Sequence, residues 1–133
     1  MIRPSSFVVC GFSAAVLFVS GGVVQAQESR MNVNPALAQR GRSLYTSKGC
    51  TICHSIGRGK TVAGPDLLGV TDRRSEDWLK RWLRAPEAMY QSDSIARSLV
   101  YQANGAKMPN QHLNDADIDA LLNYLAQETQ KKH

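Results

Sequence analysis

Five consecutive residues constrain the fold of this chain more than any other feature: Cys50, Thr51, Ile52, Cys53 and His54. On one turn of helix, positions i, i+3 and i+4 share a face. The two thiols and the imidazole are therefore directed toward the same place. The rest of the chain has to leave room beside this turn for a group that contacts two sulfur atoms and a ring nitrogen together.

The spacing C-x-x-C-H is the attachment pattern of c-type haem, in which each thiol adds to a vinyl group and the histidine binds iron. Three alternatives compete with this interpretation. A zinc ribbon needs a second C-x-x-C pair, and the third cysteine of the sequence, Cys10, lies in the leader described below. A thioredoxin-like dithiol needs strands that alternate with helices, and a disulfide between Cys50 and Cys53 closes too short a loop to stabilise much. The sequence predicts one covalent haem c per chain, attached at Cys50 and Cys53, with His54 as an iron ligand.

The first residues have the pattern of an export signal. Arg3 supplies a positive start, an apolar run begins at Phe7, and an A-x-A-like peptidase site follows at residues 24–26. We expect residues 1–26 to be a cleavable signal peptide and residues 27–133 to form one domain in the periplasm. The alternative is a retained membrane anchor, because the apolar run approaches the length that spans a bilayer.

Helical periodicity recurs along the predicted domain, and no segment alternates as a strand does. The connections are long, and the one after the attachment turn is rich in glycine. Such a chain buries little apolar surface, so a flat, covalently tied cofactor would help to complete its core. The predicted fold is all-α, a bundle of about four helices with long loops wrapped around haem. The predicted helices run from Asn34 toward Ser47, from Ser75 to a stop at Pro86, after Ser92 to near Gly105, and onward from Asn114.

An electron carrier needs a second protein ligand on the other side of the iron, and a thioether is a soft donor that raises the potential. The candidates are Met89, Met108, His112 and His133. Met108 stands in a loop after a helix end, where its side chain can turn inward. Met89 is interpreted as a core residue, the commonest role of methionine, and His112 as a solvent-facing residue. We expect Met108 to be the sixth ligand, with Met89, His112 or an open site as alternatives.

Further residues occur in an order that is typical of one family. Gly41 and Tyr45 precede the attachment turn, Gly64-Pro65-Asp66-Leu67-Leu68-Gly69-Val70 runs on to Arg73, and Met108-Pro109-Asn110 and a last helix with Leu121 and Tyr124 complete the set. Over nearly the whole predicted domain the chain resembles a class I, mono-haem cytochrome c of the exported bacterial type. The resemblance implies a cytochrome c fold and electron transfer as the function.

The resemblance also implies roles for single residues at the haem. The Pro65 carbonyl would accept a hydrogen bond from the second ring nitrogen of His54, which fixes the ring and makes it a better donor. Leu67 would pack on the haem face. Arg73 would neutralise a buried haem propionate through a charge-assisted bond.

Other residues are expected to pack helices. Gly41 would allow the terminal helix to cross closely, with Tyr45 stacking near Leu121 and Tyr124. Trp78 and Trp82, at i and i+4, are interpreted as core residues, although one indole could reach a propionate.

A haem whose two axial positions are filled by protein has no room for a substrate, so we expect outer-sphere electron transfer and not enzyme catalysis. The formal net charge of +5 suits redox partners with acidic docking surfaces. No basic tract is dense enough for nucleic acid, and membrane contact is expected only through a partner complex or an uncleaved leader. The alternatives are a ligand-binding or catalytic haem protein with an open sixth site, and a cytochrome subunit of an oxidase or reductase. Four cations lie close in sequence to the attachment turn or to Met108 and could steer an acidic partner, the alternative being an ordinary solvated surface: Lys48, Arg58, Lys60 and Lys107.

Overall fold

The computed structural model describes residues 30–59 and 63–132. The predicted signal peptide, with Cys10, lies outside the described residues, as do Lys60 and His133. Within the described part of the chain there are seven helices and no strand, which confirms the predicted all-α fold. The helices are α1 (Pro35–Ser47), α2 (Cys50–Cys53), α3 (Val70–Arg73), α4 (Glu76–Arg84), α5 (Pro86–Ser92), α6 (Ser94–Gln102) and α7 (Asp115–Gln130).

Capping side chains mark where three of the longer helices begin. Asn34, Ser75 and Asn114 each accept a hydrogen bond from a backbone N–H in the first turn of α1, α4 and α7. These caps satisfy N–H groups that have no partner inside the helix, and the sequence predicted all three. In the first turn of α7, the Asp117 carboxylate accepts a hydrogen bond of 2.6 Å from Arg40, so it ties α7 to α1.

Short helices account for the difference between the four helices predicted and the seven observed. Pro86 was predicted to stop a helix, and α4 does end at Arg84, but Pro86 is also the first residue of α5. Proline suits this position because the first N–H of a helix needs no partner. The loop after the attachment turn contains the single turn α3, whose N-cap Gly69 has a φ of 73°.

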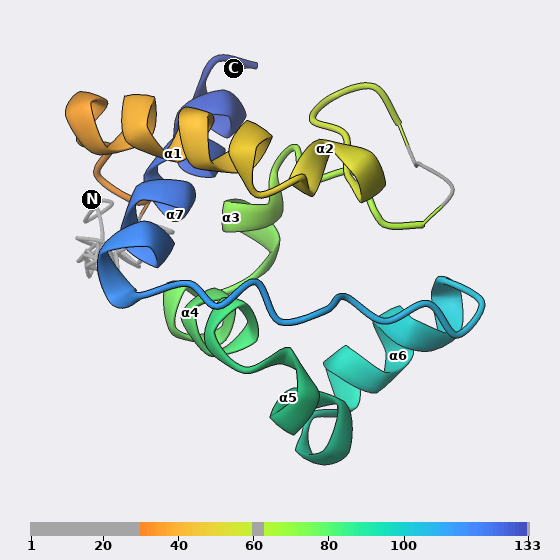
Figure 1. Ribbon diagram of the computed structural model, residues 1–133. Helices are drawn as coiled ribbons and strands as arrows, with labels where there is room; N and C mark the ends of the chain where they lie inside the picture. The colour runs from red at the N-terminus through yellow and green to blue at the C-terminus, as the bar shows by residue number, and fades with distance from the viewer. Residues whose placement is uncertain (1–29, 60–62, 133) are drawn as a thin grey trace, which may run out of the picture.

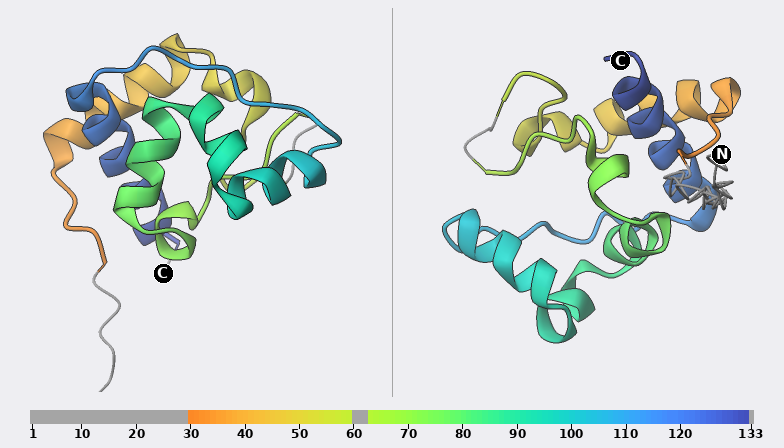
Figure 2. Two further views of the ribbon diagram at one scale, coloured as in Figure 1. Left: turned by 90° about the horizontal axis from the view of Figure 1, so that it is seen from below. Right: turned by 180° about the vertical axis from the view of Figure 1, so that it is seen from behind.

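α1 and α7 cross at Gly41, where the two ribbons lie against each other (Figures 1 and 2). A Cβ at Gly41 would overlap the carbonyl oxygen of Ala120 and lie 2.8 Å from the Cβ of Tyr124. Next to the crossing, the rings of Tyr45 and Tyr124 pack with centroids 5.6 Å apart. The close approach predicted for Gly41 and the ring contact predicted for Tyr45 are both confirmed.

A second cluster joins α4, α5 and α6 to the other face of α7. Met89 belongs to it and is 5% exposed, which confirms that it is a core residue. The buried members of the cluster are Trp78, Leu79, Met89, Ala96, Ile118 and Leu122.

None of the described helices has both the length and the hydropathy needed to cross a bilayer.

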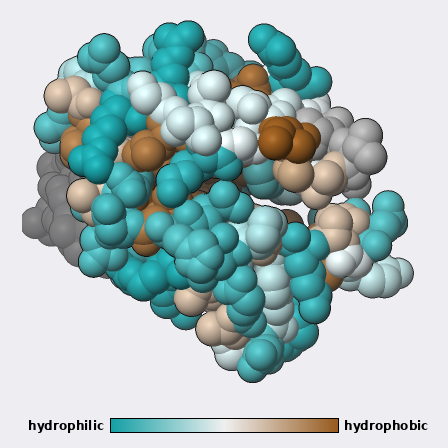
Figure 3. Space-filling view, in the orientation of Figure 1, coloured by the Kyte–Doolittle hydropathy of each residue, from teal (hydrophilic) through white to brown (hydrophobic). Residues whose placement is uncertain are grey.

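The connection from α6 to α7, residues 103–114, crosses the molecule between α2 on one side and α5 and α6 on the other (Figure 1). This connection carries Met108, and α2 carries the attachment cysteines. The space-filling view has an opening between these two parts of the molecule (Figure 3). The fold therefore brings the two segments that were predicted to bind haem to the same side of the molecule.

Candidate haem site

The two attachment cysteines lie on a single helical turn, as their spacing predicted, and His54 follows the turn as its C-cap with an extended backbone. α2 begins at Cys50 and ends at Cys53, and the N–H of His54 donates to the carbonyl of Cys50 at 2.9 Å. Both cysteines are partly buried thiols. Burial raises the pKa of the Cys50 thiol, and the neighbouring Cys53 raises it further. Two partly buried thiols on one turn fit covalent attachment to one flat group.

The imidazole of His54 is held by the loop that follows α2. Its Nδ1 lies 2.9 Å from the carbonyl oxygen of Pro65, the contact that the resemblance implied. Because a carbonyl only accepts, Nδ1 is the donor in this contact, which leaves Nε2 as the ring nitrogen available to a metal. This tautomer is the one that a metal ligand requires.

Gly64 lies directly against the His54 ring, a role that the sequence analysis did not assign. A Cβ at this position would lie 2.7 Å from His54 Cε1 and 2.8 Å from the carbonyl oxygen of Cys53. The Tyr45 hydroxyl donates to the backbone carbonyl of His54 at 3.0 Å. Burial, together with the charges of Cys50 and other neighbours, raises the pKa of Tyr45 to about 12, so the hydroxyl keeps its proton.

Asp66 organises the loop between His54 and α3, and the sequence analysis did not assign it this role. Burial alone would raise the pKa of this carboxyl, but the hydrogen bonds that it accepts lower the pKa to about 2. Its position next to Pro65 links these bonds to the carbonyl that orients His54. The signal in the sequence that could have indicated this role is an acidic residue within a glycine-rich loop, whose backbone N–H groups are accessible to a carboxylate. The donors are the Ser55 hydroxyl at 2.8 Å and the backbone N–H groups of Gly57, Arg58, Gly59 and Leu68 at 2.8–2.9 Å.

The two other predicted haem contacts lie on the same loop. The exposed Arg73 side chain folds back and donates to the carbonyls of Leu68 at 2.6 Å and Asp66 at 3.3 Å. Leu67 is half-buried, and its N–H donates to the carbonyl of Ser55 at 2.8 Å. Their roles toward a propionate and a haem face stay predictions.

Met108 is held at both its backbone and its side chain. The Tyr90 hydroxyl donates to the Met108 carbonyl at 2.8 Å, and the indole Nε1 of Trp82 donates to the Met108 sulfur at 3.2 Å. Among the other candidate ligands, Met89 is buried in the core and His112 is exposed. Met108 lines a pocket of about 470 Å³, together with Glu87, Tyr90, Gln91, Lys107 and Pro109.

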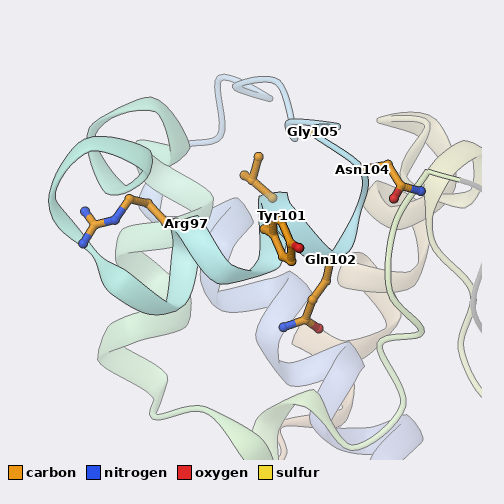
Figure 4. Close-up of a pocket in the computed structure, with 6 residues that line it drawn as sticks. Arg97, Tyr101, Gln102, Asn104 and Gly105 are labelled. Carbon is orange, nitrogen blue, oxygen red and sulfur yellow. The ribbon is translucent and has the colours of Figure 1, made fainter.

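A second pocket, of about 660 Å³, lies at the C-terminal end of α6 (Figure 4). Tyr101 extends from α6 there and is 85% exposed. None of the residues predicted to bind haem lines this pocket. Its lining residues are Arg97, Val100, Tyr101, Gln102, Asn104 and Gly105.

The donor set suits haem c and does not suit a bare metal ion. Two thiols lie on one turn, the imidazole follows it at the C-cap with Nδ1 bonded to the Pro65 carbonyl, and a thioether is held on the facing segment. Among residues 30–59 and 63–132, no three His, Cys, Asp or Glu side chains are grouped to hold a metal ion.

Comparisons with known proteins agree with this assignment. The family model for cytochrome c matches residues 38–129. A solved cytochrome c from Rhodothermus marinus superimposes with a TM-score of 0.70 at 30% identity, over 75% of this chain and 83% of that one. The cytochrome c domain of a Pseudomonas putida protein is 40% identical, with a TM-score of 0.61 over 68% of this chain and 89% of that one.

A curated relative is much longer than this chain. Cytochrome c oxidase subunit 2 of Alkalihalophilus pseudofirmus is 26% identical over 98 residues, which are 67% of this chain but 25% of that protein. This chain therefore spans about a quarter of that relative. The match of the family model to most of the described residues, on an all-α fold with a C-x-x-C-H turn, shows that this chain belongs to the cytochrome c family, as a class I member with covalently bound haem c.

Proposed function

We propose that this chain carries single electrons between redox proteins, with haem c attached at Cys50 and Cys53 and ligated by His54 and Met108. The observation that carries the proposal is that both candidate ligands are held by second partners, Pro65 for His54 and Trp82 for Met108. When bound, haem c supplies a one-electron iron couple. If His54 and Met108 both bound the iron, a substrate would have no place on it, so the proposed function is electron transfer and not catalysis.

His54 and Met108 contribute different properties to such a site. The bond from His54 to Pro65 increases the basicity of Nε2 and prevents the ring from turning. The Met108 thioether is a soft donor that favours the reduced metal. Held donors also reduce the rearrangement that accompanies a change of charge, which suits electron transfer.

Leu67 and Arg73 extend the site along the loop. We assign the half-buried Leu67 to the haem face and the Arg73 guanidinium to a propionate. The support for Arg73 is that its two bonds are to backbone carbonyls, which leave its positive charge without a carboxylate partner in those contacts.

An exposed, partly basic surface around α2 is the proposed docking site for acidic partners. Ile52, between the two cysteines, is 82% exposed. Lys48 and Arg58, which flank the attachment turn in sequence, are exposed, and so is Lys107, which precedes Met108. Lys48 also reaches the carbonyl of Gln111 at 3.5 Å, which links the end of α1 to the segment that carries Met108. Positive charge near an apolar contact would steer an acidic protein to the haem edge.

We also propose that the mature chain begins at Gln27 and works in the periplasm, on the support of the leader pattern in residues 1–26.

A second candidate function is that of a cytochrome subunit of an oxidase, which the similarity to a segment of an oxidase subunit favours. The mass and N-terminal sequence of the protein purified from an exporting host separate the two. A soluble chain that starts at Gln27 supports the carrier, and a membrane-bound chain that keeps its leader supports the subunit.

Carbon monoxide tests the coordination of the iron. A reduced protein with two protein ligands binds carbon monoxide slowly, because Met108 has to leave first. Rapid binding would instead support a ligand-binding or catalytic haem protein with an open sixth site.

A further inference from the structure

The indole of Trp82 and the thioether of Met108 are 26 residues apart in the chain and form a direct contact. Nε1 of Trp82 donates to the Met108 sulfur at 3.2 Å. We propose that Trp82 is a positioning residue for Met108, whose N–H holds the sulfur and raises the reduction potential of the haem. The inference rests on the proposed ligation by Met108.

A thioether sulfur is able to serve both partners. It carries two lone pairs and is a weak hydrogen-bond acceptor, so one pair can bind iron while the other accepts the indole N–H. The N–H withdraws electron density from the sulfur. A poorer donor stabilises the oxidised iron less, so this contact favours the reduced form.

Neighbouring rings fix the direction of the Trp82 indole. It stacks on Trp78 with centroids 5.2 Å apart and planes 13° apart, and it meets Tyr90 edge-on at 5.4 Å and 87°. Tyr90 in turn donates to the Met108 carbonyl. Trp82 and Tyr90 therefore hold the sulfur and the backbone of Met108.

Trp78 shows what the same residue type does without a sulfur partner. Its Nε1 donates to the Asp93 carboxylate at 3.1 Å, and Arg74 lies over its ring at 5.6 Å. Trp78 is 7% exposed and packs in the core, so its indole has the role that the sequence analysis expected of both tryptophans. The Trp78 N–H binds a carboxylate and the Trp82 N–H binds the Met108 sulfur, so only Trp82 is placed to position Met108.

The test replaces each indole by a ring that lacks the N–H, in the haem-loaded protein. For W82F we expect a lower reduction potential, seen as a severalfold lower ratio of reduced to oxidised protein at a fixed electrode potential. We also expect a shifted sulfur-to-iron absorption band in the oxidised protein and faster binding of added imidazole. W78F, the matched control, keeps an aromatic ring next to Trp82 and removes only the N–H that donates to Asp93, so it should keep the wild-type potential and band, although it loses stability. Thermal unfolding of both variants measures that loss separately.

Each outcome decides a different claim. A wild-type potential and band in W82F would overturn the inference while leaving Met108 as the ligand. Equal shifts of the potential in W82F and W78F would also overturn it, since packing of the stacked rings would then explain both. A wild-type protein without a sulfur-to-iron band would overturn the proposed ligation itself.

One measurement needs no substitution. In the reduced, diamagnetic wild-type protein, the porphyrin ring current should displace the indole N–H resonance of Trp82, because this proton is hydrogen-bonded to the sulfur of the proposed ligand Met108. The resonance of Trp78 should lie closer to its usual position. An undisplaced Trp82 resonance contradicts the inference even if W82F fails to fold.

Discussion

The imidazole Nδ1 of His54 lies 2.9 Å from the carbonyl oxygen of Pro65, and this contact connects the attachment turn to the loop that follows it. Everything that determines the path of the loop therefore also determines the direction of the ring. Gly64 lets the backbone approach the imidazole, and Asp66 gathers the backbone N–H groups of the loop. The following predictions test these relationships.

Gly64→Ala should disturb the haem site. The new Cβ would lie 2.7 Å from His54 Cε1, so either the ring or the loop has to move. We expect weaker ligation by His54, seen as a lower yield of haem-loaded protein and a changed absorption spectrum, and a loss of stability of about 1–3 kcal/mol. An unchanged spectrum in G64A would contradict the account of the His54 contact.

Gly41→Ala should act on the fold and not on the haem. Its Cβ would overlap the Ala120 carbonyl at the crossing of α1 and α7. We expect α1 to shift and the free energy of unfolding to fall by about 2 kcal/mol or more, measured by urea denaturation. The absorption spectrum of the folded protein should match the wild type, which makes G41A and G64A controls for each other. Wild-type stability in G41A would show that the helices cross elsewhere.

Asp66→Asn should destabilise the loop in a pH-dependent way. The amide loses the charge and part of the acceptor capacity that the backbone N–H groups use, which costs about 2 kcal/mol. The pKa of Asp66 is lowered from 3.8 to about 2, so its contribution to stability is present above pH 3.8 and is lost as the pH falls through about 2. Urea denaturation should show a wild-type advantage over D66N at pH 6 that shrinks below pH 4.

The control for Asp66 is Asp72→Asn, which changes an exposed carboxylate on α3. D72N should stay within about 0.5 kcal/mol of the wild type, as is usual for exposed positions. A stability difference between D66N and the wild type that is independent of pH would argue against the carboxylate as the origin of the effect.

Reversing the charges of Lys48, Arg58 and Lys107 should slow electron transfer to an acidic partner. The three side chains are exposed near α2 or Met108, so glutamate at these positions would repel the partner that they are proposed to attract. We expect a lower bimolecular rate by stopped flow and an inverted salt dependence. Arg97→Glu, on α6, is the control. Equal slowing by R97E would indicate a general charge effect and no docking surface.

Local signals explain what could be predicted from the sequence. The C-x-x-C-H spacing predicts one helical turn, and the caps at Asn34, Ser75 and Asn114 depend only on residues within the next turn. The contact of His54 with Pro65 was implied by the family resemblance. The turn and the caps are specified by neighbours along the chain, so they could be inferred without a structure.

The remainder depends on contacts that form only when the chain folds. Pro86 is compatible locally with the end of one helix and with the first position of the next, and its full burial in the folded chain could not be predicted from the sequence. The bonds to Asp66 need several backbone N–H groups to converge. Trp82 was interpreted as a core residue because no local signal connects it to Met108.

The most direct test of the account is the absorption spectrum of the oxidised, haem-loaded protein, recorded for the wild type, Met108→Ala and Met89→Leu. We expect a weak sulfur-to-iron charge-transfer band at the red end of the visible range in the wild type and in M89L, because Met89 is a buried core residue. The band should be lost in M108A, where no thioether reaches the iron. A band that persists in M108A, or that is missing from the wild type, would contradict ligation by Met108 and the proposal built on it.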